Sequence, residues 1–125
     1  MAGNKALVLF AHGARAASWA APFERLRDLT QARTPDVRVA LAFLELMTPR
    51  LPELVAELSA DGVTDITVVP VFLGQGGHVL RDLPLMIDQL RLDYPQTAIS
   101  VVEAAGENAA VLNALSDYCV SALPA

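Results

Sequence analysis

The sequence is poor in charge, in aromatic side chains and in cysteine. Charged residues make up 18% of the 125 residues and aromatic residues 6%, and there is one cysteine. The formal net charge is −5 and no basic block occurs, so the composition argues against a nucleic-acid partner. No apolar run approaches the roughly 20 residues of a membrane span, so we expect no transmembrane helix.

The single cysteine, Cys119, cannot form a disulfide within the chain. This usage is typical of a reducing compartment, and we expect a cytoplasmic location. Cys119 falls on the expected last helix with no histidine near it in sequence, which favours a buried, small apolar side chain over a nucleophile. The first apolar run stops at His12, and it predicts a strand and not a signal peptide.

Hydrophobic residues, in contrast, make up 54% of the chain, which is more than in an average soluble domain. Either both faces of a sheet are covered, or some apolar surface is buried against a partner. The length suits one domain with a single core, and we expect residues 1–125 to form that one domain.

Apolar strand-like runs alternate with helical patterns along the chain. The expected strands are Lys5–Ala11, Val37–Leu44, a segment within Val63–Leu73, and Ala98–Glu103. Helices are expected to start near Ser18, Thr48, Asp82 and Asn108. This alternation predicts a parallel sheet with helices on both faces. The residues of the last helix that we expect to face inward are Val111, Leu112, Leu115 and Cys119.

Proline and glycine mark the expected ends of these elements. Thr48 and Pro49 suit a helix N-cap and first turn, and Gly62 suits a C-cap. Pro84 is expected in the first turn of the third helix, where no hydrogen-bond donor is needed. Pro70 cannot donate a bond to a neighbouring strand, so we expect regular pairing to stop or bulge there.

The two histidines of the chain stand in the same local setting. His12 directly follows the first strand, and His78 follows Gly76 and Gly77 just beyond the third. Glu45 closes the second strand. Ligands of open α/β sheets bind beyond the carboxyl ends of the strands, so these three side chains reach one rim of the sheet.

Two imidazoles and a carboxylate suit a divalent transition metal with open positions, and they suit acid–base chemistry equally well. The glycines before His78 either form a turn or cradle a phosphate. No G-x-x-x-x-G-K-[ST] or G-x-G-x-x-G pattern surrounds them, however. Residue types and spacing therefore leave a metal site, an acid–base site and ordinary surface histidines open.

Three motifs narrow these alternatives: A-H-G-A-R after the first strand, A-F-L-E-L-M at the second, and V-P-V-F-L-G-Q-G-G-H-V-L-R-D-L-P after the third. Together they resemble the short, single-domain sirohydrochlorin cobaltochelatases of the CbiX type. These are class II chelatases related to the siroheme ferrochelatases. The resemblance implies a chelatase-like, flavodoxin-resembling fold, a three-layer sandwich with a four-stranded parallel sheet. It also implies ATP-independent insertion of a divalent metal into sirohydrochlorin, with no organic cofactor.

The resemblance also implies roles for particular residues. His12 and His78 match the metal-binding histidines of the family, and Glu45 matches a glutamate that is a ligand in some relatives. We predict that these three residues bind the metal and serve catalysis. One departure is Ala14, which replaces the usual serine of the first motif. The residues expected to meet the substrate's carboxylates are Arg15, Gly76, Gly77 and Arg81.

The sequence leaves several questions open. Cobalt is the expected metal, with iron and nickel as alternatives, and the product would enter cobalamin or siroheme-type biosynthesis. One domain of this size offers one wall of a cleft for a macrocycle, so we expect a homodimer. Two other function classes also place histidines in this way: a histidine phosphatase-like hydrolase, although Ala11 replaces its usual arginine, and a non-catalytic metal carrier.

Overall fold

The computed structural model describes residues 4–74 and 76–125, and the side chains of residues 77, 78 and 80 lie outside that description. The described chain forms a sheet of four parallel strands in the order β2-β1-β3-β4, which confirms the predicted fold class. The strands are β1 (Lys5–Ala11), β2 (Arg38–Phe43), β3 (Asp65–Pro70) and β4 (Ala98–Val101). The helices are η1 (Ala17–Ala20), α1 (Ala21–Arg33), α2 (Leu51–Ala60), α3 (Gly77–Asp93), η2 (Ala105–Glu107) and α4 (Ala109–Ser121).

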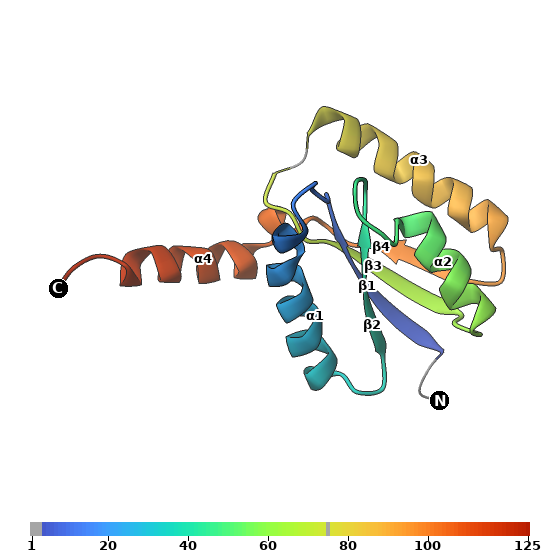
Figure 1. Cartoon of the computed structure of the whole chain (residues 1–125), viewed down its shortest axis with the longest axis horizontal. Helices are drawn as coiled ribbons and strands as arrows, with labels where there is room; N and C mark the ends of the chain where they lie inside the picture. Colours follow the sequence, from blue (N-terminus) through green and yellow to red (C-terminus); the bar gives the residue numbers. More distant parts are fainter. Residues whose placement is uncertain (1–3, 75) are drawn as a thin grey trace.

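The helices cover the two faces of the sheet unequally (Figure 1). Successive side chains of a strand point to opposite faces, so each strand feeds two apolar layers. The larger layer joins β1 and β3 to α2 and α3, and Val8, Phe10 and Ile66 are fully buried in it. The smaller layer joins Leu9 and Leu41 to residues of η1 and α1. One face is therefore covered by two long helices, and the other by α1.

The helix α4 projects away from the rest of the molecule (Figure 1). None of its residues is buried, and its main neighbour is η2. Leu112 is 47% exposed and Leu115 38% exposed, and Cys119 is exposed as well. The prediction that these side chains face inward is therefore wrong within one chain, because α4 packs on neither face of its own sheet.

Several predicted boundaries are confirmed. β1 has the expected bounds, and Pro70 is the last residue of β3, where its missing donor interrupts the ladder. Pro22 lies in the first turn of α1. Gly62 follows α2 with a φ of 87°, a left-handed conformation that glycine adopts at helix ends more readily than other residues.

Two helices start elsewhere than predicted. The N-cap of α2 is Arg50, whose backbone N–H donates to the Glu53 carboxylate at 2.8 Å, so Thr48 lies ahead of the cap. The helix α3 already starts at Gly77 and contains Pro84 in its interior. Pro84 is thus tolerated at the loss of one backbone hydrogen bond. No helix of the described residues is long and apolar enough to cross a bilayer.

Candidate metal and substrate site

The carboxyl ends of β1 and β2 are joined beyond the strands themselves. The Leu44 N–H donates to the Ala11 carbonyl at 2.9 Å, and the Glu45 N–H donates to the His12 carbonyl at 3.1 Å. Backbone hydrogen bonds thus continue to join the two segments just past β1 and β2, outside the regular ladder. This continuation brings two of the predicted site residues, His12 and Glu45, to neighbouring backbone positions at one rim.

Gly13 makes this close approach possible. It has a φ of 94°, which side chains with a Cβ rarely adopt. A Cβ added at this position would also overlap the carbonyl oxygen of Glu45. The glycine that follows His12 is therefore required by the packing of two strand ends against each other.

The imidazole of His12 is half-buried and packs against the ring of Phe72, with 4.5 Å between the ring centroids and 42° between their planes. Phe72 is 8% exposed and makes an edge contact with Phe10 at a centroid distance of 6.3 Å. Among the described side chains, no hydrogen bond to the His12 imidazole is found. The ring of Phe72 thus supports one face of this imidazole.

The Glu45 side chain is exposed at the rim, at the start of a tight turn. The Met47 N–H donates to the Glu45 carbonyl at 2.8 Å, and the residue between them, Leu46, has a φ of 67°. A three-residue turn with a non-glycine residue in this conformation is rare and strained. Leu46 is 58% exposed, so the turn presents a leucine and a carboxylate side by side.

The segment between β3 and α3 brings the third predicted residue to the same rim. The Val71 N–H donates to the Phe10 carbonyl at 2.8 Å, and Gly76 is the N-cap of α3. His78 therefore lies in the first turn of α3, but its side chain lies outside the described residues. Among the side chains that are described, no three of His, Cys, Asp or Glu form a metal-binding group. The site formed by His12, Glu45 and His78 remains a prediction.

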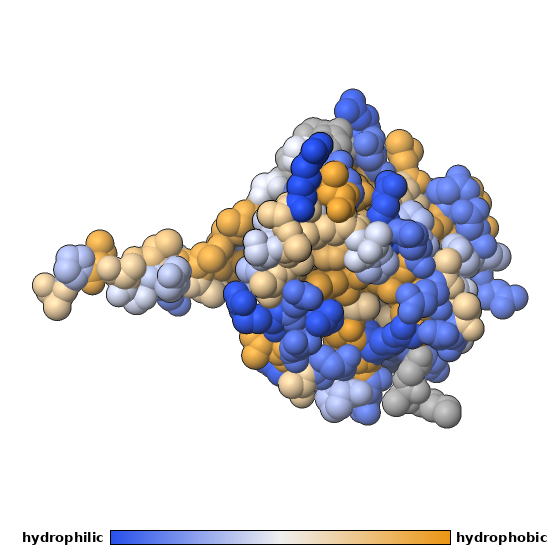
Figure 2. All heavy atoms as spheres, in the orientation of Figure 1, coloured by the Kyte–Doolittle hydropathy of each residue, from blue (hydrophilic) through white to orange (hydrophobic). Residues whose placement is uncertain are grey.

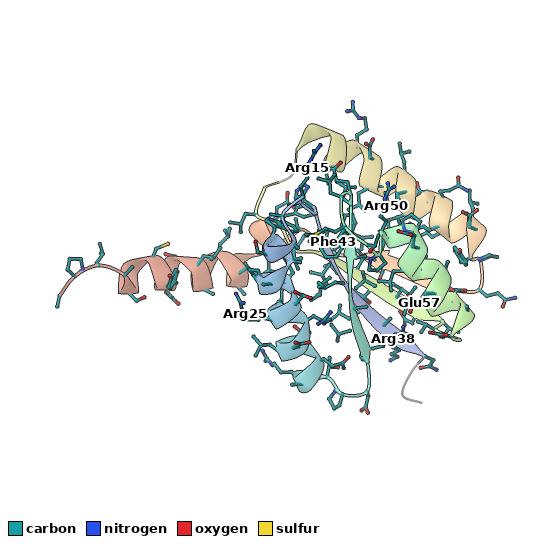
Figure 3. The ribbon with its side chains drawn as sticks, viewed as in Figure 1. Arg15, Arg25, Arg38, Phe43, Arg50 and Glu57 are labelled. Atoms are coloured by element: carbon teal, nitrogen blue, oxygen red, sulfur yellow. The ribbon has the colours of Figure 1, made fainter. Side chains whose placement is uncertain are left out.

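Arginines stand at the same rim. Arg15 lies in the connection that follows β1 (Figure 3). Arg81 lies in α3, where its side chain is 73% exposed and 3.8 Å from the Asp82 carboxylate. Sequence reasoning missed Arg50, which pairs through its backbone with Phe43 at the end of β2. Glu53, three residues later, is the signal that would have placed Arg50 at a helix start. The connections that follow β1 and β2 thus each carry an exposed arginine, and Arg81 lies in the first turns of α3.

A hollow of about 820 Å³ lies elsewhere, along β2 between α1 and α2. It includes Phe43 and Met47 near the rim, and Arg38 at its other end bonds to Glu57 at 3.2 Å. Figure 3 shows Arg38 near the amino end of β2, away from Arg15 and Arg50. His12 does not line this hollow, so it is separate from the candidate site.

Comparisons with known proteins identify the family of this chain. The CbiX family profile matches residues 6–122. The sirohydrochlorin cobaltochelatase of Methanopyrus kandleri is 35% identical over 82 residues, which are 66% of this chain and 57% of that protein. The one of Methanothermobacter thermautotrophicus is 35% identical over 78 residues, 62% of this chain and 54% of that protein.

Solved structures are similar over nearly the whole chain. One from Marinobacter aquaeolei VT8, named as a cobalamin (vitamin B12) biosynthesis CbiX protein, has a TM-score of 0.82 and 32% identity. The match covers 94% of this chain and 95% of that one. SirB from Bacillus subtilis with Fe3+ has a TM-score of 0.77 and 25% identity, and the match covers 97% of this chain and 48% of SirB.

The sheet order and the match to a solved structure over 94% of the chain define an α/β protein of the chelatase-like class. The chain belongs to the CbiX family. Its matched part spans just over half the length of the two archaeal cobaltochelatases.

Proposed function

We propose that this protein is a sirohydrochlorin chelatase that inserts a divalent metal into the macrocycle without ATP. One observation carries the proposal: the backbone link between His12 and Glu45 at neighbouring strand ends, beside the helix whose first turn contains His78. Membership in the CbiX family and the names of the archaeal relatives support the same reaction.

Cobalt is the metal we propose, because the similar archaeal proteins are named cobaltochelatases. Iron is the second candidate, because a similar protein has been solved with Fe3+, and nickel is the third. Imidazole and carboxylate ligands accept all three metals, so ligand type alone does not select one. The product would accordingly enter cobalamin or siroheme-type biosynthesis.

The chemistry requires that two pyrrole protons leave the macrocycle and that the metal sheds water. A neutral imidazole takes a proton near neutral pH and also binds the metal, so we assign both tasks to His12 and His78 without dividing them. Glu45 completes the metal site or carries protons to solvent, since its side chain is exposed at the rim. The packing of Phe72 on His12 holds one of these imidazoles in place.

The substrate carries many carboxylates, and the rim carries groups that bind them. Arg15 and Arg81 form charge-assisted hydrogen bonds with carboxylates, and we add Arg50 to this set because it stands at the same rim. Gly76 and Gly77 lie at the start of α3, where backbone N–H groups have no partner within the helix and favour anions.

We further propose that residues 1–125 act as one chelatase-like domain and that two copies form a homodimer. One rim provides one wall of a cleft, and a flat macrocycle is held best between two walls. A cytoplasmic location, which the single cysteine favours, is part of the same proposal.

The direct test is anaerobic incubation of the protein with sirohydrochlorin and cobalt, iron or nickel, followed by visible absorption spectroscopy. We expect protein-dependent conversion of the spectrum to that of the metallated product, with no added nucleotide. The matched control is Asp36→Asn, because Asp36 lies on an exposed loop just ahead of β2, at the amino ends of the strands and therefore away from the rim.

Two results would contradict the proposal. A protein that binds cobalt but leaves the tetrapyrrole spectrum unchanged would be a metal carrier. Release of phenol from a generic aryl phosphate, dependent on His12 and without chelation, would indicate the phosphatase-like hydrolase.

A further inference from the structure

The connection between β2 and α2 carries three large apolar side chains, and two of them are anchored in the core. Leu44 packs against the larger apolar layer, and Met47 packs against the smaller one. The third, Leu46, is 58% exposed. Met47 also lines the hollow along β2, whereas Leu46 does not. The side chain of Leu46 therefore belongs neither to the core nor to that hollow.

Hydrogen bonds hold the backbone of this connection at its base and at its tip. The Phe43 N–H donates to the Pro49 carbonyl at 2.9 Å, which closes the base. The Met47 N–H donates to the Glu45 carbonyl at 2.8 Å, which closes the tip around Leu46. The exposed leucine thus has a fixed backbone position, directly after the predicted metal ligand Glu45.

The backbone conformation of Leu46 is unfavourable for a leucine. Its φ is 67°, in the left-handed region where the Cβ crowds the backbone. Among the described residues it is the one residue other than glycine with a positive φ. Core burial does not compensate for this strain, because more than half of the side chain is exposed. Strained residues of this kind cluster at ligand contacts, so the observation points to a partner outside the chain.

The position of Leu46 suits the face of a tetrapyrrole. Metal insertion requires the ring to lie over the residues that deliver the metal. Glu45 donates its N–H to the His12 carbonyl at 3.1 Å, so a ring over these two residues also reaches Leu46. Figure 2 shows hydrophobic residues between the two hydrophilic side chains that lie where Figure 3 labels Arg15 and Arg50. An apolar contact flanked by guanidinium groups matches a flat ring with carboxylates at its periphery.

We propose that Leu46 is a substrate-contact residue that packs against the face of the tetrapyrrole ring and positions the ring over the metal site. This inference rests on the proposed function, because it names a further contact of the same site. The contact is apolar, so it strengthens binding of the ring and leaves binding of the metal unchanged. The fixed backbone holds the side chain in place before the ring arrives, which reduces the entropy lost on binding.

Three substitutions of Leu46 separate contact with the ring from a structural role. Leu46→Ala removes most of the side chain and keeps the strained backbone. Leu46→Met keeps a large apolar side chain, and Leu46→Gly removes both the side chain and the strain. The matched control Leu92→Ala deletes the same atoms from a leucine that is 75% exposed near the end of α3, away from the rim.

The first measurement is anaerobic binding of metal-free sirohydrochlorin, followed by its visible absorption. We expect Leu46→Ala and Leu46→Gly to raise the dissociation constant about five- to tenfold, as for the loss of a partly buried leucine contact. Leu46→Met should change it by less than about twofold, and Leu92→Ala should match the parent.

Two further measurements exclude an indirect effect. Calorimetric titration with cobalt in the absence of tetrapyrrole should give the affinity of the parent for all four variants. Leu46→Gly should unfold at a urea concentration at least as high as the parent, because glycine adopts a positive φ without strain. Weaker ring binding in a protein that is equally stable is the signature of a contact residue.

Three results would overturn the inference. Unchanged affinity of Leu46→Ala for sirohydrochlorin, when the parent binds and metallates it, would remove this contact and leave the proposed function intact. A loss of cobalt affinity in Leu46→Ala as large as its loss of ring affinity would show that Leu46 acts through Glu45 and not through the ring. A parent protein that binds no sirohydrochlorin would overturn the proposed function and this inference together.

Discussion

The imidazole of His12 rests on the ring of Phe72, with 4.5 Å between the two ring centroids. Phe72 belongs to the hydrophobic core and also lines the groove on the open face of the sheet. One aromatic side chain thus connects the predicted metal site, the core and the groove. We therefore expect substitutions in any of these three regions to change the orientation of the His12 imidazole.

The first prediction concerns Phe72 itself. Phe72→Leu keeps an apolar side chain in the core but removes the flat surface beneath His12. We expect a loss of stability of about 1 kcal/mol, as is typical of a core substitution that nearly conserves volume. Turnover should fall further than this loss explains, because His12 is less well oriented. The matched control is Phe43→Leu, whose ring packs near Trp19 at a centroid distance of 6.4 Å. Equal turnover in the two variants, measured where both are fully folded, would argue against a positioning role.

A second prediction separates two reasons why a position requires glycine: a positive φ and a lack of space for a Cβ. Gly13→Ala should cost more than about 3 kcal/mol, since a φ of 94° and an overlap with the Glu45 carbonyl act together. Gly62→Ala has a φ of 87° but no atom near the new methyl group, and should cost about 1 kcal/mol. Gly74→Ala has neither problem and should change stability by less than about 0.5 kcal/mol. Urea denaturation of the three variants checks this order, and a Gly13→Ala protein as stable as Gly62→Ala would contradict it.

The third prediction concerns the arginines of the rim. Arg50→Ala and Arg15→Ala should each raise the KM for the tetrapyrrole about fivefold, on the order of 1 kcal/mol of lost charge-assisted hydrogen bonding. The effect should shrink at high salt, because exposed charges are screened. The control is Arg33→Ala, which removes the same charge and should leave KM unchanged. Arg33 lies in the last turn of α1, near the amino end of β2 and away from the rim. Steady-state kinetics at two salt concentrations measures these KM values. An equal rise in KM for all three substitutions would indicate that the tetrapyrrole is attracted by the overall charge of the protein and not by arginines at the rim.

Much of the fold follows from local patterns in the sequence. The bounds of β1 and the end of β3 at Pro70 depend on interactions within a few residues, and these predictions are confirmed. The predicted start of α3 near Asp82 is too late, because it treats Pro84 as a first-turn residue. Gly76 caps the helix several residues earlier, and the interior tolerates the proline.

Other features depend on contacts that are distant in sequence. Phe72 looks like one more apolar residue after a strand, and only the folded chain brings its ring to His12. The prediction that Leu112, Leu115 and Cys119 face inward is wrong within one chain, because a pattern of apolar residues does not say which surface covers it. Arg50 was missed because Thr48 and Pro49 looked like the better cap, whereas Glu53 stabilises a start at Leu51.

A fourth prediction links assembly to activity and depends on both the proposed function and the proposed homodimer. The specific activity per chain should fall on dilution below the dissociation constant of the dimer, because a single rim then provides one wall of the cleft. A specific activity that is constant while sedimentation reports dissociation would show that the site does not need the second copy.

The central claim is that His12 and His78 of one chain bind a single divalent metal at the rim of the sheet, and calorimetric titration with cobalt tests it most directly. The parent and Asp36→Asn should bind one cobalt ion per chain with equal affinity. His12→Ala and His78→Ala should each lose most of this affinity, by more than about tenfold, since neither remaining ligand pair holds the metal as well. If both histidine variants bind cobalt as tightly as the parent, the shared metal site does not exist.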